Sequence, residues 1–498
     1  MNRIRIALFL AMMGLFIAGA GAAEAADTAI AGPYQPTWKS LEGHRIPEWF
    51  RDAKFGIYTH WGPVTVGCED CRNGGQWYGR EMYEPNSAVF KFHKARFGEQ
   101  NKVGYKDIIP LFKAEKFNAD TWAELFARSG ARFAGPVAVH HDNFAMWDSQ
   151  VTPWNSAQMG PHRDITGELA KAIRKRGMKL ITTFHHGFAW RYYEPAFAYD
   201  AADPKYAQLY TEPHKKDAPP SPAFLNQWLA MVDEAVIKYR PDMIWFDFEL
   251  GEVITPEYQR RMFADYYNWA CADHRQVAVA HKFPDIRQHT GVLDFERGRE
   301  ERLVPYPWLT DTALGPWFHN KYTPYRSLDN LVQAFVDVVA KNGCLLLDVD
   351  PAADGTIPGA AQRLLLGMGD WLKLNGEAIY GTRPWIVFGE GPTRTGGKAF
   401  SEESDKPFTA ADIRFTTRGS TLYAIALGWP RDGKLCIRSL AAGGQHHGNI
   451  SDVVLLGHRG PLRWTQQAGG LAVALPTEKP CQSAFVFRIT GKGLVAGQ

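Results

Sequence analysis

Short apolar runs alternate with amphipathic stretches between about residues 50 and 385, and this alternation predicts strands and helices in turn. The runs that we expect to form strands are 54–61, 133–139, 178–184, 243–248, 277–280, 292–295 and 344–349. Helical spacing of apolar residues lies between them, at about 118–129, 165–176, 221–239, 328–341 and 360–374. Strands that alternate with helices are typical of a parallel sheet with crossover connections.

Helix boundaries carry the expected capping residues. Asn118 can cap the helix that Gly130 ends, and Ser221-Pro222 combines a cap with a proline in the first turn. Arg240-Pro241-Asp242 then stops that helix before the next strand. The helix–strand assignments therefore rest on boundaries as well as on periodicity.

Polar residues gather where the predicted strands end. They are His60, His140, His141, His185, Asp247 and Glu296. Barrel enzymes carry their chemistry at the carboxyl ends of several strands. This distribution favours an α/β fold of the (β/α)8-like, TIM-type barrel class, although periodicity alone also allows an open, doubly wound sheet.

The pattern changes after Pro384. Short alternating segments such as 412–416, 421–427 and 485–489 are separated by Gly, Pro and Asp. This pattern predicts a C-terminal antiparallel β-sandwich domain at 388–498, after a catalytic barrel at 26–387. Because single aromatic residues such as Trp429 and Trp464 make a poor sugar-binding platform, we expect this domain to buttress the barrel.

The first 25 residues have the pattern of a secretory signal peptide. Arg3 and Arg5 precede an apolar run at 6–18, which is short for a membrane span, and Ala23-Glu24-Ala25 fits a cleavage site. We expect the protein to be exported, to the periplasm or the medium, without a membrane anchor.

The net charge of +3, with no charge block, argues against a nucleic-acid partner.

Asp247 and Glu296 are the candidate catalytic pair. Each follows an apolar run, and an unpaired carboxylate is costly to bury unless it has a function. Two such acids facing each other across a barrel mouth suit glycoside hydrolysis, in which one attacks and the other transfers a proton. Other acids near strand ends compete for these roles: Asp142, Asp294, Glu300 and Glu301.

The adjacent histidines His140-His141 and His185-His186 allow three interpretations: metal ligands, ligands of sugar hydroxyls, or packed structural residues. Neighbouring side chains on a strand point to opposite faces, so each pair should offer one ligand at most. No H-x-H or H-E-x-x-H spacing is present.

Cys68 and Cys71 form one C-x-x-C without a second pair, so a disulfide and two free thiols both stay open while zinc is disfavoured.

Six ordered motifs resemble the α-L-fucosidases of glycoside hydrolase family 29, over about residues 35–385. They are Trp49 to Ile57 continuing through His60-Trp61-Gly62-Pro63, Trp77 to Tyr83, His140-His141-Asp142 with Trp147-Asp148-Ser149, Trp245-Phe246-Asp247, Leu345 to Pro358, and Asn375 to Arg383. The resemblance implies a (β/α)8-like barrel with a C-terminal β-sandwich. It also implies exo-acting, retaining hydrolysis of terminal α-L-fucose from glycans, without a metal or another cofactor.

The resemblance assigns roles to residues of this chain. It implies that Asp247 is the nucleophile, and that Glu296, in Phe295-Glu296-Arg297-Gly298, is the acid/base. The substrate-binding residues that we expect are His60, Gln76, Trp77, His140, His141, His185 and Trp245. The expected partner is a fucosylated glycan or oligosaccharide.

Three departures from the family pattern keep an alternative open. Gln76 stands where many members have glutamate, Trp308-Leu309-Thr310 lacks a common polar residue, and the stretch 183–186 differs from a tyrosine-rich form. The second departure suggests an altered leaving-group side. The alternatives are a non-catalytic carbohydrate-binding protein on a fucosidase-like barrel and a metal-dependent hydrolase that uses the histidines.

Overall fold

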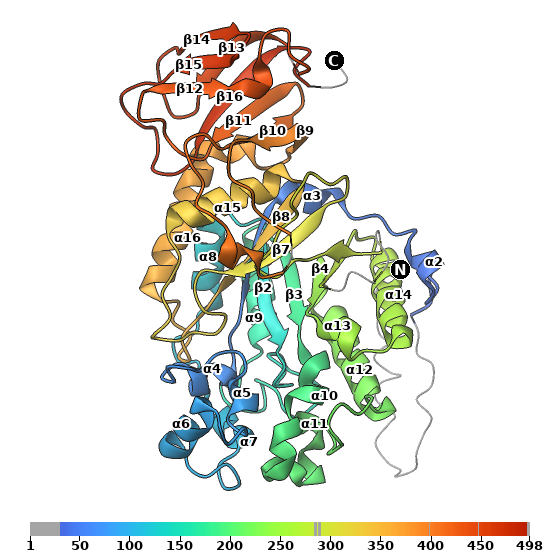
Figure 1. The fold of residues 1–498 in the computed structure, drawn as a ribbon. Helices are drawn as coiled ribbons and strands as arrows, with labels where there is room; N and C mark the ends of the chain where they lie inside the picture. Colours follow the sequence, from blue (N-terminus) through green and yellow to red (C-terminus); the bar gives the residue numbers. More distant parts are fainter. Residues whose placement is uncertain (1–29, 283–285, 287–289, 398, 447, 496–498) are drawn as a thin grey trace.

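A parallel eight-stranded sheet forms the centre of the computed structural model, which describes residues 30–495 apart from 283–285, 287–289, 398 and 447 (Figure 1). Its order is β6-β5-β4-β3-β2-β1-β8-β7. The strands are β1 (Phe55–Thr59), β2 (Phe133–Val139), β3 (Lys179–Phe184), β4 (Met243–Phe246), β5 (Ala278–His281), β6 (Val292–Leu293), β7 (Trp308–Ala313) and β8 (Gly343–Val349). The predicted barrel class is confirmed, and the open doubly wound order is absent from the described strands.

The two edge strands approach each other and nearly close the barrel. Asp294, just after β6, forms a parallel bridge with Leu309 of β7, and the Phe295 N–H donates to the Leu309 carbonyl at 3.0 Å. The Thr310 hydroxyl adds a hydrogen bond to the Phe295 carbonyl at 2.9 Å. The residues after β6 are thereby held to β7, which fixes the position of the following Glu296.

Long helices cover the outside of the barrel: α8 (Ala119–Arg128), α9 (Ile165–Lys175), α12 (Pro222–Tyr239), α14 (Pro256–Ala272), α15 (Leu328–Ala340) and α16 (Gly359–Asn375). Shorter helices are α2 (Trp38–Leu41), α3 (Glu48–Ala53), α4 (Pro63–Cys68), α5 (Tyr78–Glu81), α6 (Ala88–Arg96), α7 (Tyr105–Ile108), α10 (Ala189–Tyr192), α11 (Ala207–Tyr210) and α13 (Glu249–Glu252). Among the described residues, no helix separates β5 from β6 or β6 from β7, so the barrel departs from eight regular βα units there.

The caps read from the sequence are present. The Asn118 side chain accepts from the Thr121 N–H at 2.9 Å, and the Ser221 hydroxyl accepts from the Phe224 N–H at 3.1 Å. Arg240 ends α12 in the left-handed conformation, at φ +52°. These contacts satisfy backbone groups that a helix end leaves unpaired.

Two antiparallel sheets form the C-terminal domain. The larger has the order β13-β16-β11-β10-β9 and the smaller β12-β15-β14. The strands are β9 (Arg383–Glu390), β10 (Ile413–Arg418), β11 (Thr421–Ala426), β12 (Lys434–Ile437), β13 (Asn449–Leu455), β14 (Arg463–Gln467), β15 (Gly470–Ala474) and β16 (Phe485–Lys492). Side chains from both sheets share one core, which includes Phe415, Leu422, Leu435, Val473 and Phe487. The predicted sandwich is therefore confirmed, and the expected boundary at 387/388 falls inside β9.

The C-terminal domain lies beyond α15 and α16 in Figure 1 and is bonded to both helices. Gln333 of α15 donates to the Leu427 carbonyl at 2.8 Å, and the Trp371 indole of α16 donates to the Ala484 carbonyl at 2.9 Å. The domain therefore covers the outer helices on one side of the barrel, as expected for a buttress.

Cys68 and Cys71 are both free, buried thiols. Asn320 holds this loop, because its amide donates to the carbonyls of Cys68 at 3.2 Å, Cys71 at 2.7 Å and Gly74 at 2.9 Å. Of the two arrangements that the sequence left open, the structure has the reduced one.

The expected signal segment at 1–25 lies outside the described residues. Within the described part, none of the helices has the length and apolar character needed to cross a bilayer.

Candidate active site

A cavity of about 680 Å³ lies at the carboxyl ends of the barrel strands. Its lining includes His60, Gln76, Trp77, His140, His141, His185, Asp247, Phe248, Glu252, Lys282, Leu293, Asp294, Phe295, Glu296, Asp311, Trp317, Gly397, Ala399 and Phe400. Eight of the nine candidate site residues are in this set, and the ninth, Trp245, lies directly beneath. The structure thus brings together side chains that span more than 200 positions of the sequence.

Asp247 follows β4 and is buried, with its side chain 8% exposed. Its Oδ1 lies 2.8 Å from Lys282 Nζ, and its Oδ2 lies 3.6 Å from His141 Nε2. Burial raises the pKa of the Asp247 carboxyl. The Lys282 ammonium and the His141 ring lower it by a larger amount, so the pKa of Asp247 falls below its ordinary value. Asp247 is therefore ionised at neutral pH.

Lys282 connects the two candidate catalytic carboxylates. Its Nζ lies 2.8 Å from Asp247 Oδ1 and 2.6 Å from Glu296 Oε2, so these two oxygens can be no farther apart than the two contacts placed end to end. Retaining glycosidases separate their carboxyl groups by about 5–5.5 Å, and inverting ones by about 6.5–9.5 Å. The upper limit that Lys282 sets for these two oxygens agrees with the retaining geometry.

Two deeper carboxyl groups, Asp294 and Asp311, complete the surroundings of Lys282. Lys282 Nζ lies 3.3 Å from Asp311 Oδ2, the Tyr58 hydroxyl donates to the same oxygen at 2.8 Å, and the Trp245 indole donates to Asp294 Oδ2 at 2.9 Å. Burial raises the pKa of Asp294 and raises that of Asp311 well above its usual range. The pKa values of the two deeper carboxyl groups therefore shift in the opposite direction to that of Asp247, which Lys282 contacts at the cavity surface.

His140 and His141 both line the cavity, so the strand alternation that would direct only one of them inward does not hold here. The pairing between β2 and β3 shifts between Val137 and Val139, and both histidines lie past the end of β2. Strand alternation no longer applies beyond such an irregularity. The His141 Nδ1–H donates to the His185 carbonyl at 2.8 Å, which leaves Nε2 as an acceptor toward the cavity.

The second pair behaves as expected for a strand end. His185 lines the cavity, whereas His186 turns away, stacks on Trp228 and contacts the Trp228 carbonyl at 3.3 Å through Nε2. His186 is thus a packed structural histidine.

Buried, neutral imidazoles dominate one wall of the cavity. Burial lowers the pKa of His60 to about 3 and of His141 to about 4, and it lowers those of His140 and His185 well below the usual range. His60 is oriented by Asp348, since its Nδ1–H donates to Asp348 Oδ1 at 2.9 Å. Neutral rings of this kind can accept a hydrogen bond from a hydroxyl or bind a metal.

His60, His140 and His185 converge closely enough to consider a metal. One ring nitrogen of each lies within 4.8 Å of the others. Three histidines with an open fourth position are a known zinc donor set. The same geometry suits the vicinal hydroxyls of a sugar ring, so the donor atoms alone do not choose between the two.

Trp77 and Trp245 supply the flat apolar surfaces. The Trp77 ring stacks on His141, with centroids 5.5 Å apart, and Gln76 precedes it in the lining. Trp245 is fully buried, and the centroids of its ring and the His185 ring are 4.9 Å apart. Lys282 Nζ lies 4.9 Å from the Trp245 ring centroid. Trp245 therefore supports the floor of the cavity from below.

The competing acids lie elsewhere or deeper. Asp142 is buried behind the site, where the Tyr105 hydroxyl donates to it at 2.6 Å, and Glu300 accepts from the Tyr306 hydroxyl at 3.0 Å. Glu301 is exposed and is not part of the lining. Sequence reasoning missed Lys282, Asp311, Trp317 and Phe400, of which only Lys282 offered a signal, as a charged residue two positions after the apolar run 277–280.

Comparison with family models gives two matches. A model described as alpha-L-fucosidase matches residues 21–377, and one described as alpha-L-fucosidase C-terminal domain matches residues 405–490. An alpha-L-fucosidase of Branchiostoma floridae is 30% identical over 471 residues, which cover 92% of this chain and 96% of the relative. The plasma alpha-L-fucosidase of Homo sapiens is 30% identical over 476 residues, covering 92% of each chain.

Solved structures give the same result. The Thermotoga maritima alpha-fucosidase in complex with fucose has a TM-score of 0.73 at 28% identity, covering 92% of this chain and all of the other. The same enzyme in complex with a mechanism-based inhibitor has a TM-score of 0.74 at 27% identity, with the same coverage.

Proposed function

This chain belongs to the alpha-L-fucosidase family of glycoside hydrolases, and from that premise we propose that it acts by a two-step retaining mechanism with Asp247 as nucleophile and Glu296 as acid/base. The chain is an enzyme, and the comparisons favour a catalytic fucosidase over a non-catalytic carbohydrate-binding protein. The single observation that carries the assignment of roles is the pair of contacts from Lys282 to the two carboxylates.

In the first step, Asp247 attacks the anomeric carbon of fucose while Glu296 gives a proton to the departing glycosidic oxygen. The product is a covalent fucosyl ester on Asp247 and a free leaving group. The low pKa of Asp247 suits a nucleophile, because the carboxylate is already ionised when the substrate arrives. Glu296, with its side chain 16% exposed at the rim, has access to the leaving group and to water.

In the second step, Glu296 removes a proton from water, which attacks the anomeric carbon and releases fucose with its original configuration. Asp247 is regenerated as a carboxylate. Lys282 stabilises negative charge on both acids during the two steps, and the raised pKa values of Asp294 and Asp311 beneath it favour their neutral forms.

Substrate binding follows from the neutral histidines and the aromatic rings. We propose that His60, His140, His141 and His185 accept or donate hydrogen bonds to fucose hydroxyls, and that Gln76 adds an amide to this set. The Trp77 face, with Trp245 supporting the floor, suits packing against apolar C–H groups of the ring. A terminal fucose with its glycan outside the cavity corresponds to exo-action.

An aryl α-L-fucoside assay tests the roles of both acids. Its good leaving group reduces the need for the acid, so Asp247→Ala should abolish turnover whereas Glu296→Ala should keep part of it. Added azide should give the α-configured fucosyl azide with Glu296→Ala and the β-configured product with Asp247→Ala, because azide then attacks from opposite faces. On a natural glycan, Glu296→Ala should lose about 10²- to 10⁴-fold in rate.

Glu300→Ala is the matched control, since Glu300 is a nearby acid outside the cavity. Wild-type activity in Glu296→Ala on natural glycans, together with a loss in Glu300→Ala, would transfer the acid/base role to Glu300. The absence of any fucosyl azide would contradict a covalent intermediate on Asp247.

We also propose that the protein is exported through the segment at 1–25, on the evidence of Arg3, Arg5, the apolar run at 6–18 and the Ala23-Glu24-Ala25 site. Amino-terminal sequencing of the mature protein tests this. A mature chain beginning near Ala26 is the expected result, and an intact terminus on an intracellular protein would contradict it.

A further inference from the structure

The connection between β9 and β10 leaves the C-terminal domain and reaches the mouth of the barrel. Figure 1 shows this orange segment passing beside β7, and Gly397, Ala399 and Phe400 from it line the catalytic cavity. The domain that the sequence suggested only as a buttress therefore supplies part of the cavity wall.

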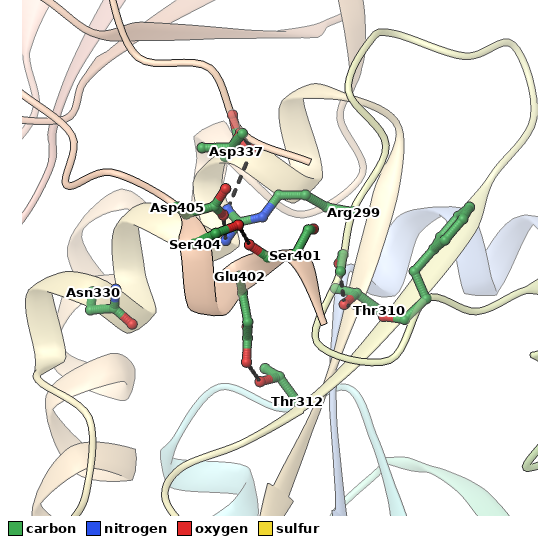
Figure 2. A network of polar contacts seen from close by, with 12 residues as sticks. Arg299, Thr310, Thr312, Asn330, Asp337, Ser401, Glu402, Ser404 and Asp405 are labelled. Atoms are coloured by element: carbon green, nitrogen blue, oxygen red, sulfur yellow. Dashed lines mark hydrogen bonds and ion pairs between the residues drawn. The ribbon is translucent and has the colours of Figure 1, made fainter. Parts of the chain in front are cut away.

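Buried polar contacts fix this segment to the barrel at its short 3-10 helix η7 (Ser401–Ser404), as Figure 2 shows. Glu402 accepts from the Thr312 hydroxyl of β7 at 2.7 Å and pairs with Arg326 at 3.1 Å. Arg299, only 5% exposed, pairs with Asp405 at 2.7 Å. Glu402 and Asp405 thus tie the segment to β7 and to the connections before and after it.

Backbone hydrogen bonds continue this attachment next to the proposed acid/base. The Phe400 N–H donates to the Glu296 carbonyl at 2.7 Å, and the Glu402 N–H donates to the Arg297 carbonyl at 2.9 Å. On the other side of Phe400, the Gly397 N–H donates to the Arg299 carbonyl at 3.0 Å. Phe400 is therefore held directly against the residue that would protonate the leaving group.

The conformation and exposure of Phe400 are unfavourable for stability alone. Its φ of +61° is left-handed, which costs an L-residue about 1–3 kcal/mol. Its side chain is 50% exposed, so little apolar burial offsets this cost. An exposed aromatic ring held in a strained conformation at the rim of a cavity indicates a binding function.

We propose that Phe400 is the platform for the leaving group: its ring packs against the C–H face of the pyranose sugar to which fucose is attached. This inference rests on the proposed roles of Asp247 and Glu296. The acid/base must contact the glycosidic oxygen, so the departing sugar lies on the Glu296 side of the cavity, where Phe400 is bonded. Leu293 and Phe295 add apolar lining on the same side.

The chemical class of the leaving group follows from this surface. Aromatic rings bind the apolar C–H face of a pyranose whose hydroxyls are mostly equatorial, as in glucose-type sugars and their N-acetyl derivatives. A charged group such as a phosphate would gain nothing from a phenyl ring. We therefore infer that the preferred substrates are fucosides of neutral pyranoses, and that a leaving group without a ring uses the platform least.

The experiment compares two substrates that differ in the leaving group. α-L-Fucosyl fluoride has no ring to place on Phe400, whereas a fucosyl disaccharide does. The disaccharide is the one that the wild type hydrolyses fastest among 1,2-, 1,3-, 1,4- and 1,6-linked fucosides of galactose and N-acetylglucosamine. The quantity measured is the ratio of kcat/KM for the disaccharide to kcat/KM for the fluoride.

Phe400→Ala should lower this ratio about tenfold, a loss of about 1.4 kcal/mol of transition-state binding. Phe400→Trp should keep or raise the ratio, because it retains an aromatic face. Ile386→Ala is the matched control, since Ile386 of β9 is equally exposed, at 50%, but lies outside the cavity lining. Unfolding midpoints of all variants should stay close to that of the wild type.

Equal losses for both substrates, or no loss for either, would overturn the platform. Failure of the proposed roles would give a different result, because Asp247→Ala would then still hydrolyse α-L-fucosyl fluoride. A changed ratio in Phe400→Ala with normal turnover of the fluoride supports both inferences together.

Discussion

Four carboxyl groups surround the single ammonium of Lys282, so the charge on each depends on how the others are arranged. Asp247 and Glu296 contact Lys282 at the cavity surface, while Asp294 and Asp311 lie deeper and have raised pKa values. The lysine lowers the pKa of Asp247 against the opposing effect of burial. At the residue scale, Lys282 is therefore the group that keeps the nucleophile ionised.

Lys282→Met tests this assignment through a pH profile. Removing the ammonium leaves burial to raise the pKa of Asp247, with only the His141 ring and the Phe248 backbone opposing it. Because the nucleophile must be ionised, activity is lost as the pH falls through that pKa. The acidic limb of kcat/KM for an aryl fucoside should therefore move to higher pH, by about one unit or more.

Lys321→Met serves as the control, because Lys321 also bridges two acids, Glu69 and Asp70, but at an exposed site. Its profile should match the wild type. An acidic limb that stays in place in Lys282→Met would show that another group controls the ionisation of Asp247.

The histidine cluster leads to a prediction about metals. If His60, His140 and His185 bind hydroxyls, then prolonged dialysis against a chelator should leave kcat/KM for an aryl fucoside unchanged. Their neutral rings need no cation for this role. Loss of activity on chelation, restored by a divalent cation, would instead assign the cluster to a metal site.

The site residues that sequence reasoning found share a local signal, and those that it missed do not. Asp247 and His140 stand out as polar groups at the ends of apolar runs. Trp317 and Phe400 lie in long connections whose paths depend on tertiary contacts. Lys282 acquires its role only when β4, β5 and the residues after β6 meet in space.

At the scale of elements, seven of the eight barrel strands could be predicted because both faces of a parallel strand are buried and the runs are apolar. β7 was not identified as a strand, because Trp308–Ala313 contains Thr310, Asp311 and Thr312 and shows no continuous apolar run. Each of these polar side chains makes a specific contact, since Thr310 bonds the residues after β6, Asp311 contacts Lys282, and Thr312 anchors Glu402. The polarity that hid β7 is what connects it to the site.

The anchor of η7 predicts the effect of Glu402→Ala. Without the bonds from Thr312 and Arg326, the segment that carries Phe400 is held less firmly at the barrel mouth. We expect KM for the fucosyl disaccharide to rise several-fold, with a much smaller change in kcat and in the hydrolysis of α-L-fucosyl fluoride. Steady-state kinetics on both substrates measure this.

Glu403→Ala is the neighbouring control, because Glu403 is exposed on the same turn and should leave both substrates unaffected. A loss in Glu402→Ala that is the same for disaccharide and fluoride would mean that η7 supports the whole site rather than the leaving-group side.

At the scale of the whole molecule, one buried ionic cluster joins the barrel to the C-terminal domain. Asp337 of α15 is fully buried and pairs with Lys341 at 2.9 Å, with Arg299 at 3.4 Å, and with Arg414 of β10 at 2.5 Å. Arg299 also holds Asp405 in the segment that carries Phe400 (Figure 2). The domain contact and the leaving-group side of the cavity therefore share one residue.

Breaking this cluster should destabilise the protein more than removing a surface charge. Asp337→Asn leaves Lys341 and Arg414 as buried cations without a paired carboxylate, which costs about 3–5 kcal/mol. Denaturant unfolding at pH 7 measures the loss. Asp370→Asn, at an exposed carboxylate of α16, should change stability by less than about 0.5 kcal/mol.

The pH dependence of that loss has a definite sign. Burial raises the pKa of Asp337, but the neighbouring cations Lys341, Arg414 and Arg299 lower it by a larger amount. The pKa of Asp337 in the folded protein therefore lies well below the value of about 3.9 in an unfolded chain. The stabilisation is therefore complete above about pH 5 and declines as the pH falls through the unfolded value, because the unfolded carboxyl then binds protons that the folded one does not. The difference in unfolding free energy between wild type and Asp337→Asn should be constant from pH 7 to pH 5 and should narrow toward pH 3. A constant difference down to pH 3 would mean that the lost hydrogen bonds, rather than the charge of Asp337, connect the two domains.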